Sequence, residues 1–347
     1  MKRRVDPGPR GRRAVLATAA VFAMTQMVLA VAEETVRPDL RDPSFGTRLI
    51  RLRQRVRERP GAPLVVAVGS SRVELGFRPD ALGPSPDGPI VFNFGQPAAG
   101  PVREWLVLRR LWDDGIRPAR VLVEVMPPAL AAGGPIDGAL SASRLGWGDV
   151  ADLAPESDHP WIMCGEWLAA RLVPVCSGRF CLVSRVAPLM LPVADRLDYV
   201  WNGLDADGAC ELPAAVATPE GRRHGLAVAA AEYRDRLSEF TIAPVPDRFL
   251  RRILDDCRRQ DAPAALLLMP EGEAFRQWYP PGAGERLDAY VRGLADEFGV
   301  PVIDARRWMR DEDFWDGHHL LPGGAAAFSR RLALEAKAFL GTEPADR

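Results

Sequence analysis

The chain has 347 residues, of which 47% are hydrophobic and 26% are charged, and its formal net charge is −1. This length is enough for a well-buried core and allows one large domain or two smaller ones. The near-neutral charge excludes the basic surface of a nucleic-acid-binding protein, so we expect no nucleic-acid partner.

The chain begins with a basic segment followed by an apolar run. The run AVLATAAVFAMTQMVLAVA covers residues 14–32 and is preceded by six basic side chains: Lys2, Arg3, Arg4, Arg10, Arg12 and Arg13. This pattern predicts a signal anchor or a signal peptide over residues 1–35, with the rest of the chain on the extracytoplasmic side. The length of the run favours a membrane anchor facing the periplasm or another extracytoplasmic space. Ala30-Val31-Ala32 resembles a cleavage site, and cleavage there would give a secreted protein.

A charged segment with a helical pattern, residues 36–62, predicts a stalk. Apolar runs follow at 64–69, 89–95 and 120–126, and an amphipathic stretch at 102–115 separates the last two. Because these runs are nearly continuous rather than alternating, they are typical of parallel strands covered on both faces.

Residues 131–240 interrupt this order and are interpreted as an insertion or cap. The segment is rich in Gly, Pro, Trp and Cys, and we expect its tryptophans to pack in the core or the cap: Trp147, Trp161, Trp167 and Trp201. The alternative for these tryptophans is a platform on which sugars stack. Five cysteines in an extracytoplasmic compartment predict a disulfide-stapled middle region with at least one thiol left over: Cys164, Cys176, Cys181, Cys210 and Cys257. No C-x-x-C pair supports a zinc site.

The alternation of helices and strands resumes after residue 241. Helical patterns at 247–260, 284–299 and 325–340 alternate with apolar runs at 264–270 and 301–305. Residues 63–130 and 241–345 together therefore predict a doubly wound, flavodoxin-like α/β domain, with a parallel five-stranded sheet sandwiched by helices. Ligands bind such sheets at the carboxyl ends of the strands, where both Gly69-Ser70-Ser71 and the loop 316–319 are expected.

These two loops contain the residues of a possible nucleophilic site. Asp316 precedes His319 by three residues on a glycine-containing loop, so its carboxylate can accept the Nδ1 proton and leave Nε2 free to act as a base. A serine hydroxyl needs such a base within hydrogen-bond reach, and Ser71 is the candidate nucleophile. The alternative for Ser70 and Ser71 is a helix N-cap and first-turn residue. Asp316 with His318 and His319 could instead ligate a metal, but no further ligand is suggested, and we expect neither metal nor cofactor.

These residues resemble the SGNH or GDSL-type serine hydrolases. Ser71 in VAVGSSRVELGF is similar to the first-block serine, with Ser70 in place of the usual aspartate, and DGHHLLPGG matches the last-block D-x-x-H. The resemblance covers residues 63–130 and 246–340. It implies Ser71 as nucleophile, His319 as base and Asp316 as its orienting partner, with His318 as a supporting neighbour.

The oxyanion hole of the family is incomplete in this chain. FNFGQPAAGP resembles the second block, whose donor glycine is Gly95 or Gly100, but the third-block asparagine is missing and Glu124 lies near its place. A carboxylate cannot donate to an oxyanion unless it is protonated, and loss of one donor costs on the order of 10²–10³ in turnover. We expect Arg72 to form a structural ion pair with Glu124.

The resemblance implies a serine esterase or O-acyltransferase acting on acyl esters, with a carbohydrate or cell-envelope polymer as substrate and a membrane acyl-donor protein as a further partner. Exclusion of water by the cap would favour transfer over hydrolysis. The alternative is a non-catalytic assembly component of a polysaccharide export or modification complex that keeps the fold and has lost the oxyanion hole.

Overall fold

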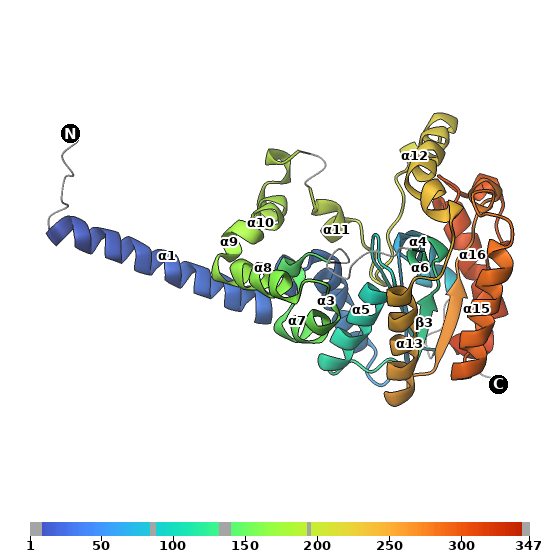
Figure 1. Cartoon of the computed structure of the whole chain (residues 1–347), viewed down its shortest axis with the longest axis horizontal. Coiled ribbons are helices and arrows are strands. Elements are labelled where there is room, and N and C mark those ends of the chain that lie inside the picture. The colour runs from blue at the N-terminus through green and yellow to red at the C-terminus, as the bar shows by residue number, and fades with distance from the viewer. Residues whose placement is uncertain (1–8, 84–87, 132–139, 193–195, 342–347) are drawn as a thin grey trace. The chain divides into compact units, whose positions relative to one another are not determined.

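The structure is a computed structural model that describes residues 9–83, 88–131, 140–192 and 196–341 (Figure 1). Lys2, Arg3 and Arg4 of the basic segment and residues 132–139 of the expected insertion lie outside the described residues. The chain divides into two compact units. Unit 1 comprises Met1–Gly46 and Leu140–Asp198, and unit 2 comprises Thr47–Ala139 and Tyr199–Arg347.

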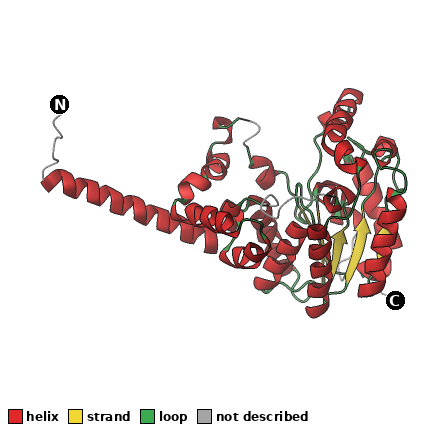
Figure 2. Ribbon diagram, viewed as in Figure 1, coloured by secondary structure: helices red, strands yellow, loops and turns green. Residues whose placement is uncertain are grey.

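Unit 2 is built on a five-stranded sheet in which every adjacent pair of strands is parallel. Its strands are β1 (Leu64–Gly69), β2 (Ile90–Gly95), β3 (Arg120–Glu124), β4 (Ala264–Leu268) and β5 (Val302–Asp304). Their order in the sheet is β2-β1-β3-β4-β5, which is the flavodoxin-like order predicted from the sequence. The predicted doubly wound α/β fold is therefore confirmed, and Figure 2 shows the strands surrounded by helices.

The sheet is buried because helices cover both of its faces. Every residue of β1, β2 and β4 is buried, as their continuous apolar runs predict. On one face, Val65 and Leu267 share a core cluster with Phe328 and Leu332 of α16 (Pro322–Glu335). A second pair of helices, α5 (Pro101–Asp113) and α13 (Pro244–Arg259), packs together, and α5 contacts β1 while α13 contacts β4.

Further helices of unit 2 lie between the strands or after β5 in the chain. They are α4 (Ser71–Gly76), η1 (Pro79–Leu82), α6 (Pro127–Leu130), η7 (Ala214–Ala217), α12 (Pro219–Ser238), α14 (Glu273–Arg276), α15 (Ala283–Phe298), η8 (Asp311–Asp313) and α17 (Lys337–Leu340). The closing helix expected at 325–340 is thus two helices, separated at Ala336. Helix α12 falls inside the expected insertion 131–240, yet it belongs to the unit of the sheet.

The segment expected as a stalk is also part of a folded unit. It contains α2 (Pro38–Arg41) and α3 (Pro43–Glu58), and from Thr47 onward α3 belongs to unit 2. Leu49 and Leu52 are buried, and the buried guanidinium of Arg48 donates to Glu74 at 2.6 Å. The sequence suggested a stalk because the arginines of α3 dominate its composition, whereas its few leucines determine which side is buried.

Unit 1 is helical in its described residues. Its elements are α1 (Pro9–Thr35), α2, η3 (Ala142–Arg144), α7 (Trp147–Leu153), η4 (Ala154–Glu156), α8 (Pro160–Leu172), α9 (Pro174–Ser177), α10 (Arg179–Val186) and η5 (Pro188–Met190). By length and composition, α1 is a helix that could cross a membrane, as an anchor or signal sequence would. A short helix, α11 (Asp198–Asn202), follows at the boundary between the units.

The predicted disulfides are absent, because all five cysteines are free thiols. Cys164, Cys176 and Cys181 lie in unit 1, whereas Cys210 and Cys257 lie in unit 2. The buried Cys181 thiol donates to the Asp39 carbonyl at 3.8 Å. Buried Cys257 on α13 belongs to the core of unit 2, so these two cysteines serve as small packing residues.

Substitution of Gly95 tests the packing at the end of β2. A Cβ at Gly95 would overlap the backbone nitrogen of Glu74 and lie 2.9 Å from the carbonyl oxygen of Ser70. We expect Gly95→Ala to lower the free energy of unfolding by about 1–3 kcal/mol, measured by chemical denaturation. The control is Gly293→Ala on α15, where an added Cβ meets nothing within 4 Å, and it should stabilise by up to about 1 kcal/mol. Equal effects of the two substitutions would contradict this packing.

Candidate active site

Ser71 is the first residue of α4, directly beyond the carboxyl end of β1. Ser70 occupies the N-cap, where its hydroxyl accepts the backbone N–H of Arg72 at 3.1 Å. The N-cap interpretation therefore holds for Ser70, and this cap leaves the hydroxyl of Ser71 free for another partner. Gly69 allows the Glu124 side chain to approach the end of β1 closely, because a Cβ at Gly69 would lie 2.6 Å from Glu124 Oε2.

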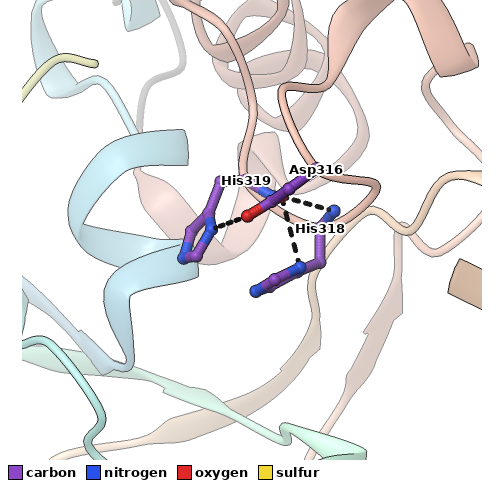
Figure 3. A group of neighbouring side chains, drawn as sticks. All are labelled: Asp316, His318 and His319. Atoms are coloured by element: carbon purple, nitrogen blue, oxygen red, sulfur yellow. Dashed lines mark hydrogen bonds and ion pairs between the residues drawn. The ribbon is translucent and has the colours of Figure 1, made fainter. Parts of the chain in front are cut away.

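The second half of the site is the loop Asp316–His319, between η8 and α16. Gly317 adopts a left-handed conformation with φ of +89°, which lets the chain fold back on Asp316. The Asp316 Oδ1 atom accepts the backbone N–H groups of His318 at 3.1 Å and His319 at 2.8 Å (Figure 3). These two hydrogen bonds hold the Asp316 carboxylate in place and stabilise the turn of the loop.

Ser71, His319 and Asp316 form a continuous hydrogen-bonded chain. His319 Nε2 lies 2.7 Å from Ser71 Oγ, and His319 Nδ1 lies 2.7 Å from Asp316 Oδ2. With Nδ1 protonated and donating to Asp316, Nε2 can take the proton of the Ser71 hydroxyl. The contacts expected from the sequence are present, and this arrangement can activate a serine as a nucleophile.

Asp316 is ionised in this environment. Its burial alone would raise the pKa, but the neighbouring His319, reinforced by the hydrogen bonds from that residue, holds the pKa of the Asp316 carboxyl well below its ordinary value. An ionised Asp316 fixes the tautomer of His319 and stabilises the imidazolium that forms when Ser71 loses its proton.

His318 lies in an aromatic pocket beneath the loop. Its ring centroid lies 5.0 Å from those of Tyr233 and Phe275, and only 3% of the residue is exposed. Burial, and then the proximity of His319, lowers the pKa of His318 well below its ordinary value, so this imidazole is neutral. It packs under the loop as a supporting neighbour.

The same three side chains could be considered as metal ligands. Asp316, His318 and His319 each offer a ligand atom within 4.8 Å of the others. Both ring nitrogens of His319 already face other groups, Asp316 and Ser71. A metal here would have to replace one of these contacts, so the residues fit the serine arrangement better than a metal centre.

The two glycines expected as oxyanion-hole donors differ in their environment. The N–H of Gly95 donates to Asn93 Oδ1 at 2.8 Å, so it is occupied by the protein itself. The geometry therefore does not support Gly95 as a donor. Gly100 is the N-cap of α5, and within the described residues neither its N–H nor that of Ser71 has a protein acceptor. Both N–H groups are therefore backbone candidates for oxyanion donors.

A buried charge network lies under Ser71. The ion pair expected between Arg72 and Glu124 is present, with Nε and Oε1 3.7 Å apart, and a second carboxylate, Glu271, lies 3.3 Å from Arg72 Nη1. Arg72 Nη2 also donates to the carbonyls of Met269 and Pro270, each at 2.9 Å. The guanidinium thus joins α4 to the ends of β3 and β4.

Glu124 accepts a hydrogen bond instead of donating to the site. Its Oε2 atom accepts the backbone N–H of Ser70 at 2.6 Å, which holds the turn before the nucleophile. Burial raises the pKa of Glu124, and burial together with the nearby Glu124 raises the pKa of Glu104 on α5 well above its ordinary value. Neither oxygen of Glu104 has a hydrogen-bond partner in the described part of the chain.

The sequence did not point to two buried polar residues near the site, Asn93 in β2 and Gln96 directly after it. Asn93 Nδ2 donates to the carbonyls of Val73 and Phe77 at 2.7 and 2.6 Å, which anchors α4. Gln96 follows β2 directly, is 3% exposed, and has no partner for its Nε2 among the described residues. A polar residue inside the apolar run IVFNFG was the available signal for Asn93.

A cavity of about 380 Å³ lies beside the Asp316–His319 loop. Its lining includes Trp315 and Gly317 of the loop and Arg222, Arg223 and Leu226 of α12. The loop and α12 are tied together, since Trp315 Nε1 donates to the Gly221 carbonyl at 2.9 Å. The Trp315 ring also stacks with the His319 imidazole, with 6.2 Å between the centroids.

No protein-family model matches the chain, and no curated protein matches it in sequence. Among solved structures, a proposed acylhydrolase from Bacteroides fragilis is 12% identical with a TM-score of 0.39 and covers 85% of this chain and 98% of its own. An acetylxylan esterase from Geobacillus stearothermophilus is 12% identical with a TM-score of 0.33 and covers 81% of this chain and 95% of its own. At identities and scores this low, the likenesses carry no inference about function.

Removal of Arg72 tests the buried network. Arg72→Met leaves Glu124 and Glu271 without their cation, so we expect a loss of about 3–5 kcal/mol in the free energy of unfolding. The control is Arg331→Met, whose exposed pair with Glu335 spans 3.8 Å and should cost about 0–1 kcal/mol. Denaturant titration of both variants measures the difference, and similar losses would show that Arg72 is not buried as described.

His318 predicts a specific pH dependence of stability. Its pKa is lower in the folded protein than the ordinary value of about 6.5, so its contribution to stability is complete above that pH and is lost as the pH falls below it. The loss is at most about 1.4 kcal/mol per pH unit for one group. We expect His318→Phe to unfold with a smaller decrease in melting temperature between pH 7.5 and 5.5, and exposed His224→Phe to behave like wild type. An unchanged pH dependence in His318→Phe would contradict this assignment.

Proposed function

We propose that this protein is a membrane-anchored, extracytoplasmic serine enzyme of the SGNH type that hydrolyses or transfers acyl esters. The observation that carries the proposal is the chain of two 2.7 Å contacts from Ser71 Oγ through His319 to Asp316. Serine, base and orienting carboxylate are the three parts that nucleophilic acyl transfer requires.

The reaction follows from these positions. Ser71 Oγ attacks the ester carbonyl while its proton passes to His319 Nε2, and a tetrahedral intermediate forms. His319 then protonates the leaving alcohol oxygen as the carbon–oxygen bond breaks, which leaves the acyl group on Ser71. Attack by water, with its proton taken by His319, releases a carboxylic acid. Attack by an acceptor hydroxyl instead produces a new ester.

Charge on the tetrahedral intermediate needs hydrogen-bond donors. The N–H groups of Ser71 and Gly100 are the backbone donors that this proposal uses, because both lack a protein acceptor within the described residues. The side-chain amide of Gln96 is the third donor, because it is buried and lacks an acceptor among the described residues. The backbone N–H of Gln96 donates to the Gly69 carbonyl, which places this residue beside the nucleophile turn. In this proposal Gln96 takes the task of the missing third-block asparagine.

The proposed substrate class comes from the resemblance to the SGNH hydrolases. The resemblance implies that the substrates are acyl esters, above all acetyl esters, of exported carbohydrate or cell-envelope polymers. It also implies a membrane protein as acyl donor. The cavity beside the loop supports a bulky substrate, because it combines an indole ring, Trp315, with two cationic side chains, Arg222 and Arg223.

A second candidate is a non-catalytic assembly component with the same fold. The observation in its favour is Glu124, whose carboxylate accepts the Ser70 N–H near the place where the family has an oxyanion donor. Glu124 also pairs with Arg72, so its carboxylate is engaged as an acceptor and offers no hydrogen to an oxyanion.

Labelling of the full-length protein with a fluorophosphonate separates the two candidates. We expect covalent labelling of wild type, none for Ser71→Ala and almost none for His319→Ala. Asp316→Asn should react about 10⁴-fold more slowly, as expected when the base loses its orienting carboxylate. The matched control is Ser238→Ala, which removes an exposed hydroxyl at the end of α12 and should label like wild type.

Absence of labelling in folded wild type, or labelling that survives Ser71→Ala, would overturn the enzyme proposal. If wild type is labelled, a fresh, unlabelled sample of it is then given 4-nitrophenyl acetate with and without an oligosaccharide acceptor. Mass spectrometry of the products shows whether the acetyl group goes to water or to the sugar.

A further inference from the structure

Unit 1 exposes large apolar side chains to an unusual degree. Among the described residues of its segment 140–198, ten large hydrophobic side chains are exposed, whereas those of unit 2 expose five. The most exposed are Trp161 at 87%, Leu189 at 83%, and Val186 and Met190 at 81% each. Soluble surfaces rarely carry such a concentration, and it marks an interaction face.

This apolar segment packs directly on α1, the helix that could cross a membrane. Helix α1 contacts α8 and α9 within unit 1. Gln26, the polar residue inside the apolar run, is 6% exposed, and its Oε1 accepts the backbone N–H of Val175 at the start of α9 at 3.2 Å. Near the end of α1, Glu34 pairs with Arg171 of α8 at 2.8 Å.

These contacts set the depth of α9 relative to the apolar run. Gln26 lies six residues before Ala32, the end of the run, which corresponds to about 9 Å along a helix. If α1 spans a bilayer, its contact with Val175 therefore lies within the hydrocarbon and not above it. The Gln26 amide and the first N–H of α9 satisfy each other, as polar groups in hydrocarbon must.

The composition of the segment fits this depth. Between Pro160 and Leu191 only four residues are charged: Glu166, Arg171, Arg179 and Arg185. Arg171 is paired with Glu34, and the guanidinium of Arg179 lies 4.5 Å from the ring centroid of Phe180. Trp147 and Trp161, which the sequence suggested as packing residues, are instead exposed, as expected for side chains at a membrane interface.

We propose that residues 160–191 insert into the lipid leaflet at the carboxyl end of α1, so that α1, α8, α9 and α10 form one membrane-embedded helical cluster. Lipid is the occupant that fits best, because the exposed side chains are spread over α8, α10 and η5, and α8 packs against α1, whose apolar side chains are also exposed. Removal of residues 1–32 as a signal peptide would take Gln26 away from α9, so the proposal requires that the mature protein keeps α1. The inference depends on α1 as an anchor and not on esterase activity.

Site-specific photocrosslinking in lipid nanodiscs tests the insertion. The photoreactive p-benzoylphenylalanine replaces Leu189 or Met190 in the full-length protein, with Phe22 on α1 as the positive control. The matched control is Leu334 of unit 2, which is 77% exposed against 83% for Leu189. We expect phospholipid adducts at Leu189 and Met190 within about threefold of the Phe22 yield and at least about tenfold above Leu334.

Three results would overturn the proposal. Lipid adducts at Leu189 and Met190 no higher than at Leu334 would remove the segment from the bilayer. Failure of Phe22 to label, or an intact mass that lacks residues 1–32, would remove the anchor on which the depth depends. Adducts in native membranes to another protein in place of lipid would assign the apolar face to a membrane-protein partner. Fluorophosphonate labelling is read separately, so each proposal can fail alone.

Discussion

The buried guanidinium of Arg72 is the contact on which the geometry of the site depends. It reaches from the first turn of α4 to two carbonyls after β4 and to carboxylates at the ends of β3 and β4. Parallel strands bring these ends to one edge of the sheet, but they do not fix the distances between the loops. A buried ion pair contributes little net stability, so its value here is positional.

The nucleophile turn is held in a similar way from its other side. Glu124 accepts the N–H of Ser70, and Asn93 donates to the carbonyls of Val73 on α4 and Phe77 directly after it. Each of these polar groups is buried, and each would be costly if left without a partner. The turn that carries Ser71 is therefore determined by partners from β2 and β3, which surround β1 in the sheet.

Unit 1 follows a different physical rule. In unit 2 the large side chains of Trp105 and Phe249 are buried, whereas in unit 1 those of Trp161 and Leu189 are exposed. Exposure of large apolar side chains is unfavourable in water, and the proposed insertion beside α1 would place them in lipid instead.

Local patterns in the sequence determined the strands, the flavodoxin-like sheet and the pairing of Ser71 with His319 and Asp316. Continuous apolar runs identify buried parallel strands, and such strands must bring their following loops to one edge. Tertiary structure alone decided that the N–H of Gly95 is occupied by Asn93, that α3 packs through Leu49 and Leu52, and that the cysteines stay free. Those outcomes depend on which distant groups meet, because a hydrogen-bond donor or a thiol has no partner until the chain has folded around it.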